Sequence, residues 1–498
     1  MLRKVKIVLA IVLFAAVTLL FLDFTGTLHA WLGWAARIQF LPALLALNVG
    51  VVVGLVALTL VLGRVYCSVI CPLGIFQDIV AHVSHSRKKK RYSYSPALTW
   101  LRLIVLAVFV AALIGGVGAV VALLAPYSSY GRIVSNFFAP LYAWCNNALA
   151  FFAEKADSYA FYSTDVWLKS LPTFVIAGVT LVAITILAWR GGRTYCNTIC
   201  PVGTVLGFLS RFSWLKPVIH EEQCIKCNRC ARGCKASCID VRNHRIDYSR
   251  CVACMNCLDQ CREGAIHYEH PRRITAKAPV EQPAAPTSEK SSSRRSFLTL
   301  AGAMTVGVAV QAQQKKVDGG LAVIENKKTF NRVTPLVPPG SVSLSHFTQH
   351  CTACQLCVSV CDNDVLRPST HLSRLMQPEM SYERGYCRPE CTKCSDVCPA
   401  GAIRPITVAE KSSVQIGHAV WDSTNCVVLT DKVECGNCAR HCPAGAITMI
   451  PSSKQPDSLK IPAVNVERCI GCGACENLCP SRPFSAIHVE GHEVHSEV

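Results

Sequence analysis

The sequence predicts an α-helical membrane unit joined to small cysteine-rich α+β domains. Two patterns predict this fold class: apolar runs long enough to cross a bilayer occupy the N-terminal part, and most of the 30 cysteines recur in regularly spaced sets. The 498 residues are 51% hydrophobic but only 16% charged, which is typical of a chain that lies partly in a membrane.

Four apolar runs are each long enough to span a bilayer core of about 30 Å. They cover residues 7–22, 41–62, 97–124 and 171–189. Basic residues precede the first run and fill positions 87–91 between the second and third. Because Lys and Arg are enriched in cytoplasmic loops, both ends of this unit are expected to face the cytoplasm. The net charge of +18 is attributed to this topology and to lipid contact rather than to nucleic-acid binding.

Residues 63–74 and 192–203 both read Gly-Arg-x-Tyr-Cys-x2-Ile-Cys-Pro-x-Gly, which indicates a duplicated helix pair. Proline favours the first turn of a helix, so Cys71 and Cys200 are predicted to cap short helices along the membrane surface, where a helix N-terminus lowers a thiol's pKa. The alternative is two structural corners whose cysteines only pack. If the halves meet, they form an additional redox metal site from Cys67, Cys71, Cys196 and Cys200.

The segment 127–144 is rich in aromatic residues and is predicted to be a loop that anchors at the membrane interface. The edge of a quinone pocket is the alternative. Cys145, just after it, belongs to no set and is expected to pack among apolar side chains.

Two sets of cysteines spaced C-x2-C-x2-C-x3-C follow the fourth run: Cys224, Cys227, Cys230, Cys234, Cys251, Cys254, Cys257 and Cys261. In this spacing three thiolates of one loop hold an iron–sulfur cube and the fourth ligates a neighbouring cube. Zinc is the alternative, although zinc sites rarely use two runs of four. Cys238 occupies a position that holds alanine in other sets, so it is expected to be a small buried residue rather than a ligand.

Residues 271–293 are rich in Pro, Ala, Ser and charge and predict a flexible linker. The following segment, 294–314, begins with Arg294-Arg295 and resembles a twin-arginine export signal, which carries folded, cofactor-loaded domains. It is expected to be retained as a fifth span, with cleavage near 310–312 as one alternative and a basic linker beside a short buried helix as the other. Residues 315–345 form a second predicted linker.

The last part, 346–498, holds four more sets: Cys351, Cys354, Cys357, Cys361, Cys387, Cys391, Cys394, Cys398, Cys426, Cys435, Cys438, Cys442, Cys469, Cys472, Cys475 and Cys479. The second and third of these have wider gaps. Ligand exchange between sets is expected, in sequential or nested order. A disulfide-rich exported domain is the alternative, but the repeated C-x2-C spacing argues against it. The six sets together predict six [4Fe-4S] clusters.

The paired sets in 216–270 resemble a two-cluster bacterial ferredoxin, so the cysteine-rich parts are expected to be α+β bacterial-type ferredoxin domains beside the membrane unit of 1–215. The resemblance implies that Cys261 completes one site and Cys234 the other. The first site would hold Cys224, Cys227, Cys230 and Cys261, and the second Cys251, Cys254, Cys257 and Cys234.

More broadly, residues up to about 270 resemble the NapH-type membrane quinol dehydrogenase ferredoxins, and those from about 290 onward resemble the NapG/MauM-type periplasmic four-cluster ferredoxins. The chain thus resembles a fusion of the two. This implies a multi-pass protein of the bacterial cytoplasmic (inner) membrane, with its N-terminal half facing the cytoplasm and its C-terminal domain in the periplasm. Quinol would donate electrons, and a periplasmic oxidoreductase or cytochrome, such as a nitrate reductase, would accept them.

A maturation or regulatory protein that keeps a periplasmic enzyme's cofactor reduced is the alternative function. Haem is not expected, since the sequence has no C-x-x-C-H motif and no histidine within the four apolar runs. Covalent flavin is not expected either, since the sequence shows no domain that would carry it. The route of electrons across the bilayer, the direction of flow and the acceptor do not follow from the sequence.

Overall fold

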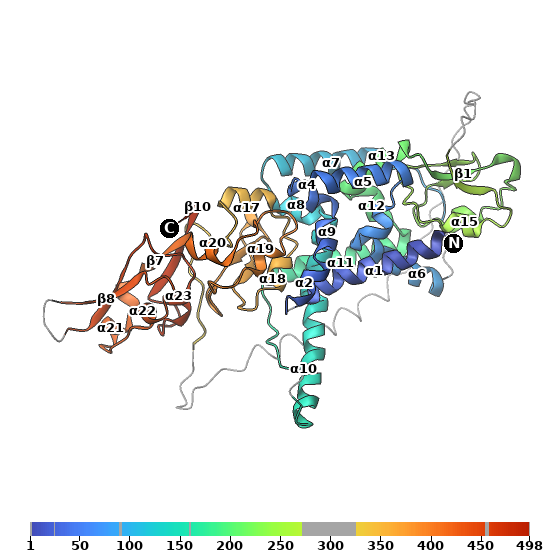
Figure 1. The fold of residues 1–498 in the computed structure, drawn as a ribbon. Coiled ribbons are helices and arrows are strands. Elements are labelled where there is room, and N and C mark those ends of the chain that lie inside the picture. Colours follow the sequence, from blue (N-terminus) through green and yellow to red (C-terminus); the bar gives the residue numbers. More distant parts are fainter. Residues whose placement is uncertain are drawn as a thin grey trace, which may run out of the picture.

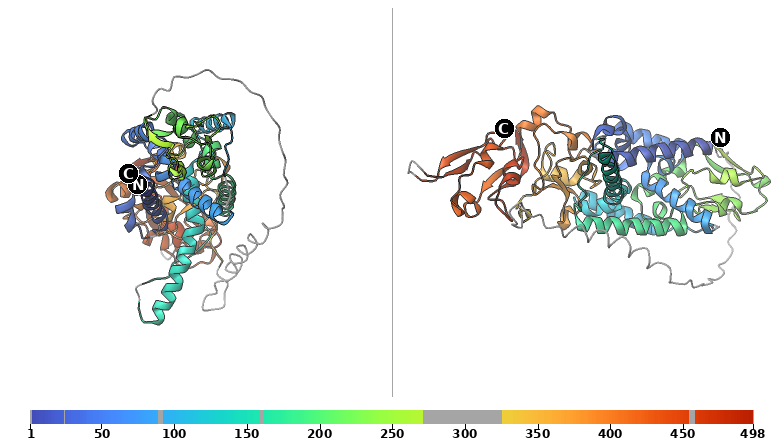
Figure 2. Two further views of the ribbon diagram at one scale, coloured as in Figure 1. Left: turned by 90° about the vertical axis from the view of Figure 1, so that its right-hand side faces the viewer. Right: turned by 90° about the horizontal axis from the view of Figure 1, so that it is seen from below.

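The structure is a computed structural model that describes residues 2–23, 25–88, 92–158, 161–270, 325–453 and 458–497. It consists of a helical unit (residues 2–215), a first cysteine-rich unit (216–270) and a second cysteine-rich unit (325–497). The two cysteine-rich units lie at opposite ends of the helical unit (Figures 1 and 2). The linker 271–293, the segment 294–314 with its predicted fifth span, and residues 315–324 lie outside the described residues.

Two helices in the described part of the chain are long and apolar enough to cross a membrane. They are α1 (Leu2–Leu22) and α11 (Leu171–Gly191), each of 21 residues. They coincide with the predicted runs 7–22 and 171–189, and those two predictions are confirmed as far as length and composition go.

The prediction of four continuous spans is wrong, because the other two runs are each divided into shorter helices. These are α4 (Phe40–Leu45) and α5 (Val49–Leu62) in one run, and α7 (Thr99–Ile114) and α8 (Gly118–Leu124) in the other. Asn48 starts α5 by accepting a hydrogen bond from the Val51 N–H at 3.3 Å. Gly116 separates α7 from α8 with a φ of 70°, which glycine adopts at little cost. Apolar composition alone does not reveal such breaks.

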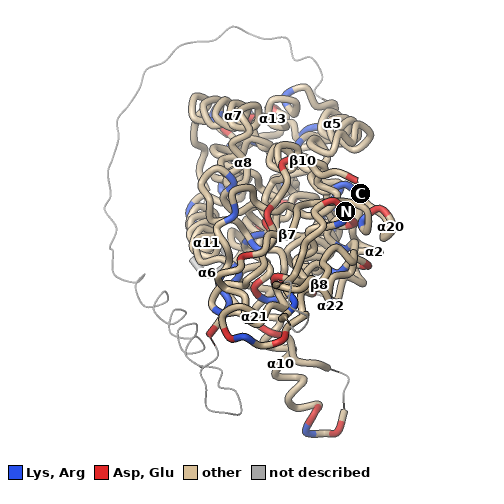
Figure 3. Tube along the Cα trace, turned by 90° about the vertical axis from the view of Figure 1, so that its left-hand side faces the viewer, with Lys and Arg blue, Asp and Glu red and all other residues tan. Residues whose placement is uncertain are grey.

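The segment predicted as an aromatic loop is helical instead. It forms α9 (Pro126–Ile133), a π-helical turn η2 (Val134–Phe138) and α10 (Ala139–Lys155). Every residue of α9 is buried in the centre of the helical unit. In contrast, α10 projects sideways from the long axis of the molecule, and charged residues on it occur only near its far tip (Figures 1 and 3). Cys145 on α10 is exposed, so the expectation that it packs among apolar side chains is wrong.

The duplicated motifs start similar pairs of elements. The first gives η1 (Tyr66–Ile70) and α6 (Pro72–Lys88), and the second gives α12 (Thr194–Thr198) and α13 (Pro201–Leu209). Each longer helix begins at the motif's proline, as predicted. However, α6 has 17 residues and packs along α11 and α9, while α13 has nine residues and packs against α7. The expected position of these helices along the membrane surface stays a prediction. Short helices complete the unit: α2 (Thr27–Leu32), α3 (Trp34–Arg37) and η3 (Ser210–Phe212).

The first cysteine-rich unit has the α+β form that was predicted. Its elements are β1 (Lys216–Ile219), η4 (Glu221–Gln223), α14 (Arg229–Arg232), β2 (Ile239–Asp240), β3 (Arg245–Ile246), α15 (Asn256–Gln260) and β4 (Ile266–Glu269). Strand β1 pairs antiparallel with β4, and β2 pairs antiparallel with β3. The unit has its own hydrophobic core and is tied to the helical unit where Tyr268 donates its hydroxyl to the Leu62 carbonyl at 2.7 Å.

The second cysteine-rich unit contains three antiparallel strand pairs among its described residues. They are β5 (Leu366–Pro368) with β6 (Pro378–Met380), β7 (Val414–Trp421) with β10 (Ile487–Glu497), and β8 (Ile447–Pro451) with β9 (Lys460–Val464). Its helices are α17 (Leu344–His350), α18 (Leu356–Ser359), η6 (Leu372–Arg374), α19 (Lys393–Asp396), α20 (Val408–Ser413), η7 (Ser423–Asn425), α21 (Val427–Thr430), α22 (Asn437–Arg440) and α23 (Ala474–Leu478).

The second cysteine-rich unit and the helical unit share one continuous hydrophobic core. At their junction, Gly131 of α9 lies directly against the Cys354 carbonyl and the ring of Phe21, so a Cβ at this position would collide with both. Asn136 donates to the Gln355 side chain across the same junction at 3.1 Å. The close approach of α9 therefore fixes how the two units dock.

We expect Gly131→Ala to destabilise this junction by about 1–3 kcal/mol, because the added methyl group overpacks a filled space. Thermal unfolding of the purified protein in detergent measures the loss. Gly54→Ala is the matched control, since a Cβ at Gly54 meets nothing within 4 Å. Equal melting temperatures for the two variants would contradict the described junction.

Candidate metal centres

The four sets with the regular C-x2-C-x2-C spacing share one loop conformation. The residues immediately before and after the second cysteine of each set have positive φ angles between 48° and 78°. These residues are Lys226, Asn228, Ala253, Met255, Ala353, Gln355, Gly471 and Gly473. Left-handed backbone of this kind is uncommon outside glycine. It folds the loop around its own sulfurs, as when the Ala353 N–H donates to the Cys351 sulfur at 3.4 Å.

The first cysteine-rich unit contains two small cavities, each lined by four of the predicted ligands. One is lined by Cys224, Cys227, Cys230 and Cys261, and the other by Cys234, Cys251, Cys254 and Cys257. The fourth cysteine of each set therefore lies with the first three of the other set. This is the exchanged grouping that the resemblance to two-cluster ferredoxins implied.

Cys238 also lines the second of these cavities and is fully buried. Its sulfur lies 3.5 Å from the Cys234 sulfur, and its thiol also interacts with Cys251. The hydrogen bond from Cys238 is the main reason that the pKa of Cys234 falls to about 6. The predicted burial of Cys238 is confirmed, but its contact with two predicted ligands was missed, because spacing alone assigns it no partner.

The second cysteine-rich unit groups its first two sets in the same exchanged way. Cys361 lines a cavity with Cys387, Cys391 and Cys394. Conversely, Cys398 lies within electrostatic reach of Cys351, Cys354 and Cys357.

The last two sets repeat the exchange. Cys442 lies within electrostatic reach of Cys469, Cys472 and Cys475. Conversely, Cys479 and Cys435 both lie within electrostatic reach of Cys438. Cys426, the remaining predicted ligand, is buried at the N-terminus of α21. The exchange is therefore sequential rather than nested, a question that the sequence left open.

All 30 cysteines lie among the described residues, and each is free rather than disulfide-bonded. Within the same residues, no group of three or more His, Cys, Asp or Glu side chains is close enough to hold a single metal ion.

The cysteines of the duplicated motifs meet inside the helical unit. All four are buried, and Cys67, Cys71 and Cys196 lie within electrostatic reach of Cys200. Cys200 caps α13 by accepting a hydrogen bond from the Gly203 N–H at 3.3 Å, as predicted. However, burial, followed by the neighbouring thiols, raises the pKa of Cys200 well above its ordinary value, so the predicted lowering by the helix N-terminus is outweighed.

Two arginines cross between the duplicated motifs in a reciprocal way. Arg64 of the first motif donates to the Cys196 carbonyl at 3.2 Å and to the Asn197 side chain at 3.1 Å. Arg193 of the second motif donates to the Cys67 carbonyl at 2.6 Å. Each motif therefore holds the other's cysteine loop. The conserved spacing of this arginine in both copies of the repeat was the signal that could have revealed its role.

The final glycine of each motif provides the space for this exchange. A Cβ on Gly74 would collide with Arg193 and the neighbouring backbone, and a Cβ on Gly203 would collide with the Cys196 carbonyl and crowd Arg64. The glycines of the repeat are therefore explained by close approach rather than by a special backbone angle.

The charges around the four thiols favour an anionic centre. Arg193 forms an ion pair with Asp78 at 2.6 Å. Arg64 is completely buried, has no carboxylate partner among the described ion pairs, and approaches the Cys67 sulfur at 3.6 Å. Its Nε atom has no hydrogen-bond partner. A buried guanidinium needs a counter-charge, which a thiolate-ligated metal centre would supply. The residues present therefore fit such a centre.

Contacts connect the four thiols of the helical unit with the cysteine groups of the two cysteine-rich units. Arg64 also donates to the Ser249 carbonyl at 2.9 Å, beside Cys251 of the first cysteine-rich unit. On the other side of the four thiols, Tyr195 lies within reach of both Cys200 and Arg132.

Beyond Tyr195, Tyr127 and Arg132 of α9 lie within electrostatic reach of Cys354 in the second cysteine-rich unit. Within that unit, the Cys387 N–H donates to the Cys472 carbonyl at 3.0 Å and joins two further groups. The cysteine groups therefore form a row along the long axis of the molecule.

Comparison with protein families places 4Fe-4S domains along the chain. A model described as "4Fe-4S binding domain" matches 44–91 and 171–219, which contain the duplicated motifs, and a second model of that description matches 244–267. A "4Fe-4S dicluster domain" matches 433–482.

Curated relatives agree with these domains. The ferredoxin-type protein NapF of Escherichia coli K12 is 30% identical over 158 residues, which cover 31% of this chain and 86% of NapF. The chain belongs to the ferredoxin-type 4Fe-4S proteins. The methylamine utilization ferredoxin-type protein MauM of Methylophilus methylotrophus is 31% identical over 171 residues, which cover 32% of this chain and 72% of MauM.

This ferredoxin-type protein is also similar to two uncharacterised proteins of Methanocaldococcus jannaschii. One is 29% identical over 104 residues, and the chain spans less than half of it, 42%. The other is 24% identical over 278 residues, which cover 54% of this chain and 95% of that protein. No solved structure matches the chain. The predicted class, an iron–sulfur electron-transfer protein of ferredoxin type, is confirmed, while the resemblance to NapH stays a prediction.

We expect Cys234→Ser and Cys238→Ser to differ in iron content, although the two sulfurs lie only 3.5 Å apart. Cys234→Ser removes a predicted ligand and should lower the iron content by up to about four atoms per chain. Cys238→Ser should keep the iron of the wild type. Iron and acid-labile sulfide, measured on anaerobically purified protein, distinguish the two. An equal loss in Cys238→Ser would show that Cys238 is itself a ligand.

Proposed function

We propose that this ferredoxin-type protein is anchored in the bacterial cytoplasmic membrane and passes electrons from the quinol pool to a periplasmic reductase, such as a nitrate reductase. In this proposal it combines a NapH-type membrane part with a NapG/MauM-type four-cluster part. The observation that carries the proposal is the row of cysteine groups, which continues from the first cysteine-rich unit through the helical unit into the second. A 4Fe-4S cluster exchanges one electron at a time, so function requires such centres in sequence.

The cluster ligands in this proposal are the 24 cysteines of the six sets. Three small cavities, each lined by cysteines from two neighbouring sets, support the exchange of ligands between sets. The four thiols of the duplicated motifs hold a seventh centre. When bound, that centre would supply one-electron redox chemistry in the helical unit, between the cysteine groups of the two cysteine-rich units. Arg64 and Arg193 contribute by binding the two loops together and by balancing its negative charge.

The proposed topology places the two cysteine-rich units on opposite sides of a bilayer. Supporting it, α1 and α11 are long enough to span, and the units lie at opposite ends of these helices (Figure 2). Large apolar side chains of both helices are exposed along the body, where lipid would cover them. The twin-arginine segment 294–314 would then export the second cysteine-rich unit after its clusters are installed.

Transfer across lipid provides the test. The protein is reconstituted into vesicles that contain trapped ferricyanide, and dithionite is added outside without oxygen. We expect rapid ferricyanide reduction with the wild type. The double variant Cys67→Ser/Cys196→Ser should fall to the rate of vesicles without protein, because the row is interrupted in the helical unit.

Cys145→Ser is the matched control, since Cys145 is exposed on α10 and belongs to no cysteine group. It should transfer electrons like the wild type. Iron content and the electron paramagnetic resonance spectra of the six remaining clusters should be retained in the double variant. Unchanged transfer by the double variant would remove the seventh centre from the proposed path, and no transfer by the wild type would refute the transmembrane function itself.

A further inference from the structure

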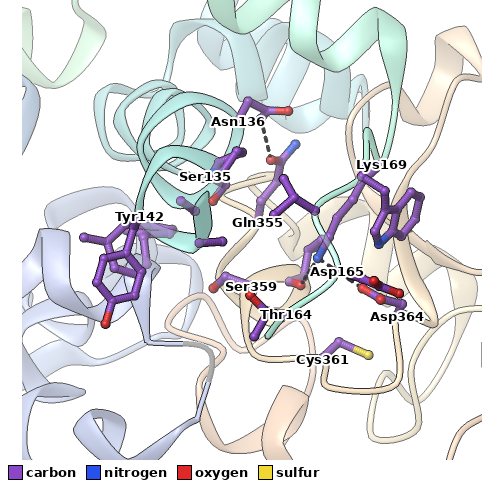
Figure 4. Close-up of a pocket in the computed structure, with 18 of the residues that line it drawn as sticks. Ser135, Asn136, Tyr142, Thr164, Asp165, Lys169, Gln355, Ser359, Cys361 and Asp364 are labelled. Carbon is purple, nitrogen blue, oxygen red and sulfur yellow. Dashed lines mark hydrogen bonds and ion pairs between the residues drawn. The ribbon is translucent and has the colours of Figure 1, made fainter. Parts of the chain in front are cut away.

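A cavity of about 830 Å³ lies where the helical unit meets the second cysteine-rich unit. Its walls come from the end of α1, from η2 and the base of α10, from residues 162–169 and from α18 with the loop that follows it. Figure 4 shows Ser135 and Asn136 on one side of it and Gln355, Ser359 and Cys361 on another. The volume is typical of sites for small organic ligands.

Three polar atoms of residues that line this cavity are buried and have no hydrogen-bond partner. They are Oγ of Ser135, Nε1 of Trp167 and Nε2 of Gln355. Gln355 is held in place because its side-chain oxygen accepts from Asn136 at 3.1 Å, which leaves its amide N–H groups unused (Figure 4). An unpaired buried donor costs about 1–3 kcal/mol. Because these atoms are covered by protein, a ligand with oxygen acceptors would pair with them after a small rotation of the side chains that line the cavity.

The position of Trp167 is fixed by the second cysteine-rich unit. The guanidinium groups of Arg367 and Arg384 lie 4.6 Å and 4.4 Å from the centre of its ring. Close by, Lys169 donates to the Val358 carbonyl at 2.9 Å. The wall formed by 162–169 is thus held against the second unit, and the cavity is preformed rather than created by a loose loop.

One part of the wall is apolar and leads to an apolar surface, while Asp165, Lys169, Asp362 and Asp364 make another part charged. Phe21, Leu22, Ala139 and Pro140 line the cavity beside the polar groups. Beyond it, α10 carries large apolar side chains that are 44–66% exposed: Leu141, Trp144, Leu149, Phe151 and Phe152. A ligand with a polar head and a long apolar tail fits both features.

The cavity also reaches a predicted cluster ligand. Cys361 lines both this cavity and the small cavity that it shares with Cys387, Cys391 and Cys394. Gln355 lies between Cys354 and Cys357 of the neighbouring group. A redox-active ligand bound here would therefore lie beside two groups of cysteines.

We infer that this cavity binds the head group of a lipid-soluble quinol, an inference that rests on the proposed function. The two ring oxygens would accept hydrogen bonds from Gln355, Trp167 or Ser135 once these side chains turn towards the cavity, and the isoprenoid tail would follow the apolar part of the wall towards α10. Oxidation of one quinol to the quinone breaks two O–H bonds. The two protons would pass to the aqueous side, where Asp364 and Asp165 line the cavity, and the two electrons would go, one each, to 4Fe-4S clusters held by the neighbouring groups of cysteines.

Binding is tested with a fluorescent hydroxyquinoline N-oxide, a menaquinol analogue whose fluorescence is quenched on binding, titrated into the purified full-length protein. Ser135→Ala removes one hydrogen-bond donor with little change of volume, and Trp167→Phe removes the indole N–H together with one of the two fused rings. We expect each to weaken binding roughly 3- to 10-fold, the equivalent of one hydrogen bond. Trp100→Phe is the matched control, since Trp100 is exposed on α7 and does not line the cavity, and it should bind like the wild type.

A photoreactive azidoquinone then locates the site by peptide mapping, with labelling expected in 135–143 or 162–169. Iron content should be equal in all variants, which excludes a loss of folding. Unchanged binding in Ser135→Ala and Trp167→Phe, or labelling confined to other segments, would overturn the cavity assignment. If a menaquinol analogue still reduced the clusters of these variants at the wild-type rate, the proposed function would stand without this site. Binding of the analogue without any reduction of wild-type clusters would instead refute quinol as the donor.

Discussion

The reciprocal contacts of Arg64 and Arg193 hold the centre of this molecule together. Each arginine is fully buried and donates to the cysteine loop of the other repeat, so neither half can form its loop correctly alone. Arg193 is balanced by Asp78, but no carboxylate in the described part of the chain forms an ion pair with Arg64. Breaking a buried charged contact is costly, since it leaves a charge uncompensated in an apolar environment. The helical unit therefore depends on both repeats being present, and the proposed anionic centre between them would balance the charge of Arg64.

The rest of the structure is positioned from this point. Arg64 also contacts Ser249, which places the first cysteine-rich unit beside the four thiols. Tyr195, in the second motif, lies towards α9, and α9 in turn approaches Cys354 of the second unit through Gly131. Since these contacts join buried backbone and side chains directly, the distances between successive cysteine groups are set by packing rather than by flexible linkers.

The sequence predicted the features that depend on local spacing. Cysteine intervals such as Cys251–Cys254–Cys257 specify a loop and its ligands, so the sets, the exchanged grouping of the first unit and the repeat of the helical unit could all be anticipated. Local spacing does not report a cap such as Asn48 or a turn such as Gly116, and the four predicted spans became two long helices and four shorter ones. The cavity joins Asn136 to Gln355, 219 positions apart, which no local pattern can indicate.

The exchange of fourth cysteines has a consequence for how such a chain can evolve and be engineered. Cys234 and Cys261 each leave their own set to complete the neighbouring group, and Cys361 and Cys398 do the same. Excising a single set would thus leave two incomplete centres instead of one. The smallest segment that can be gained, lost or transplanted is a pair of sets, so the number of centres in the two cysteine-rich units grows or shrinks in steps of two.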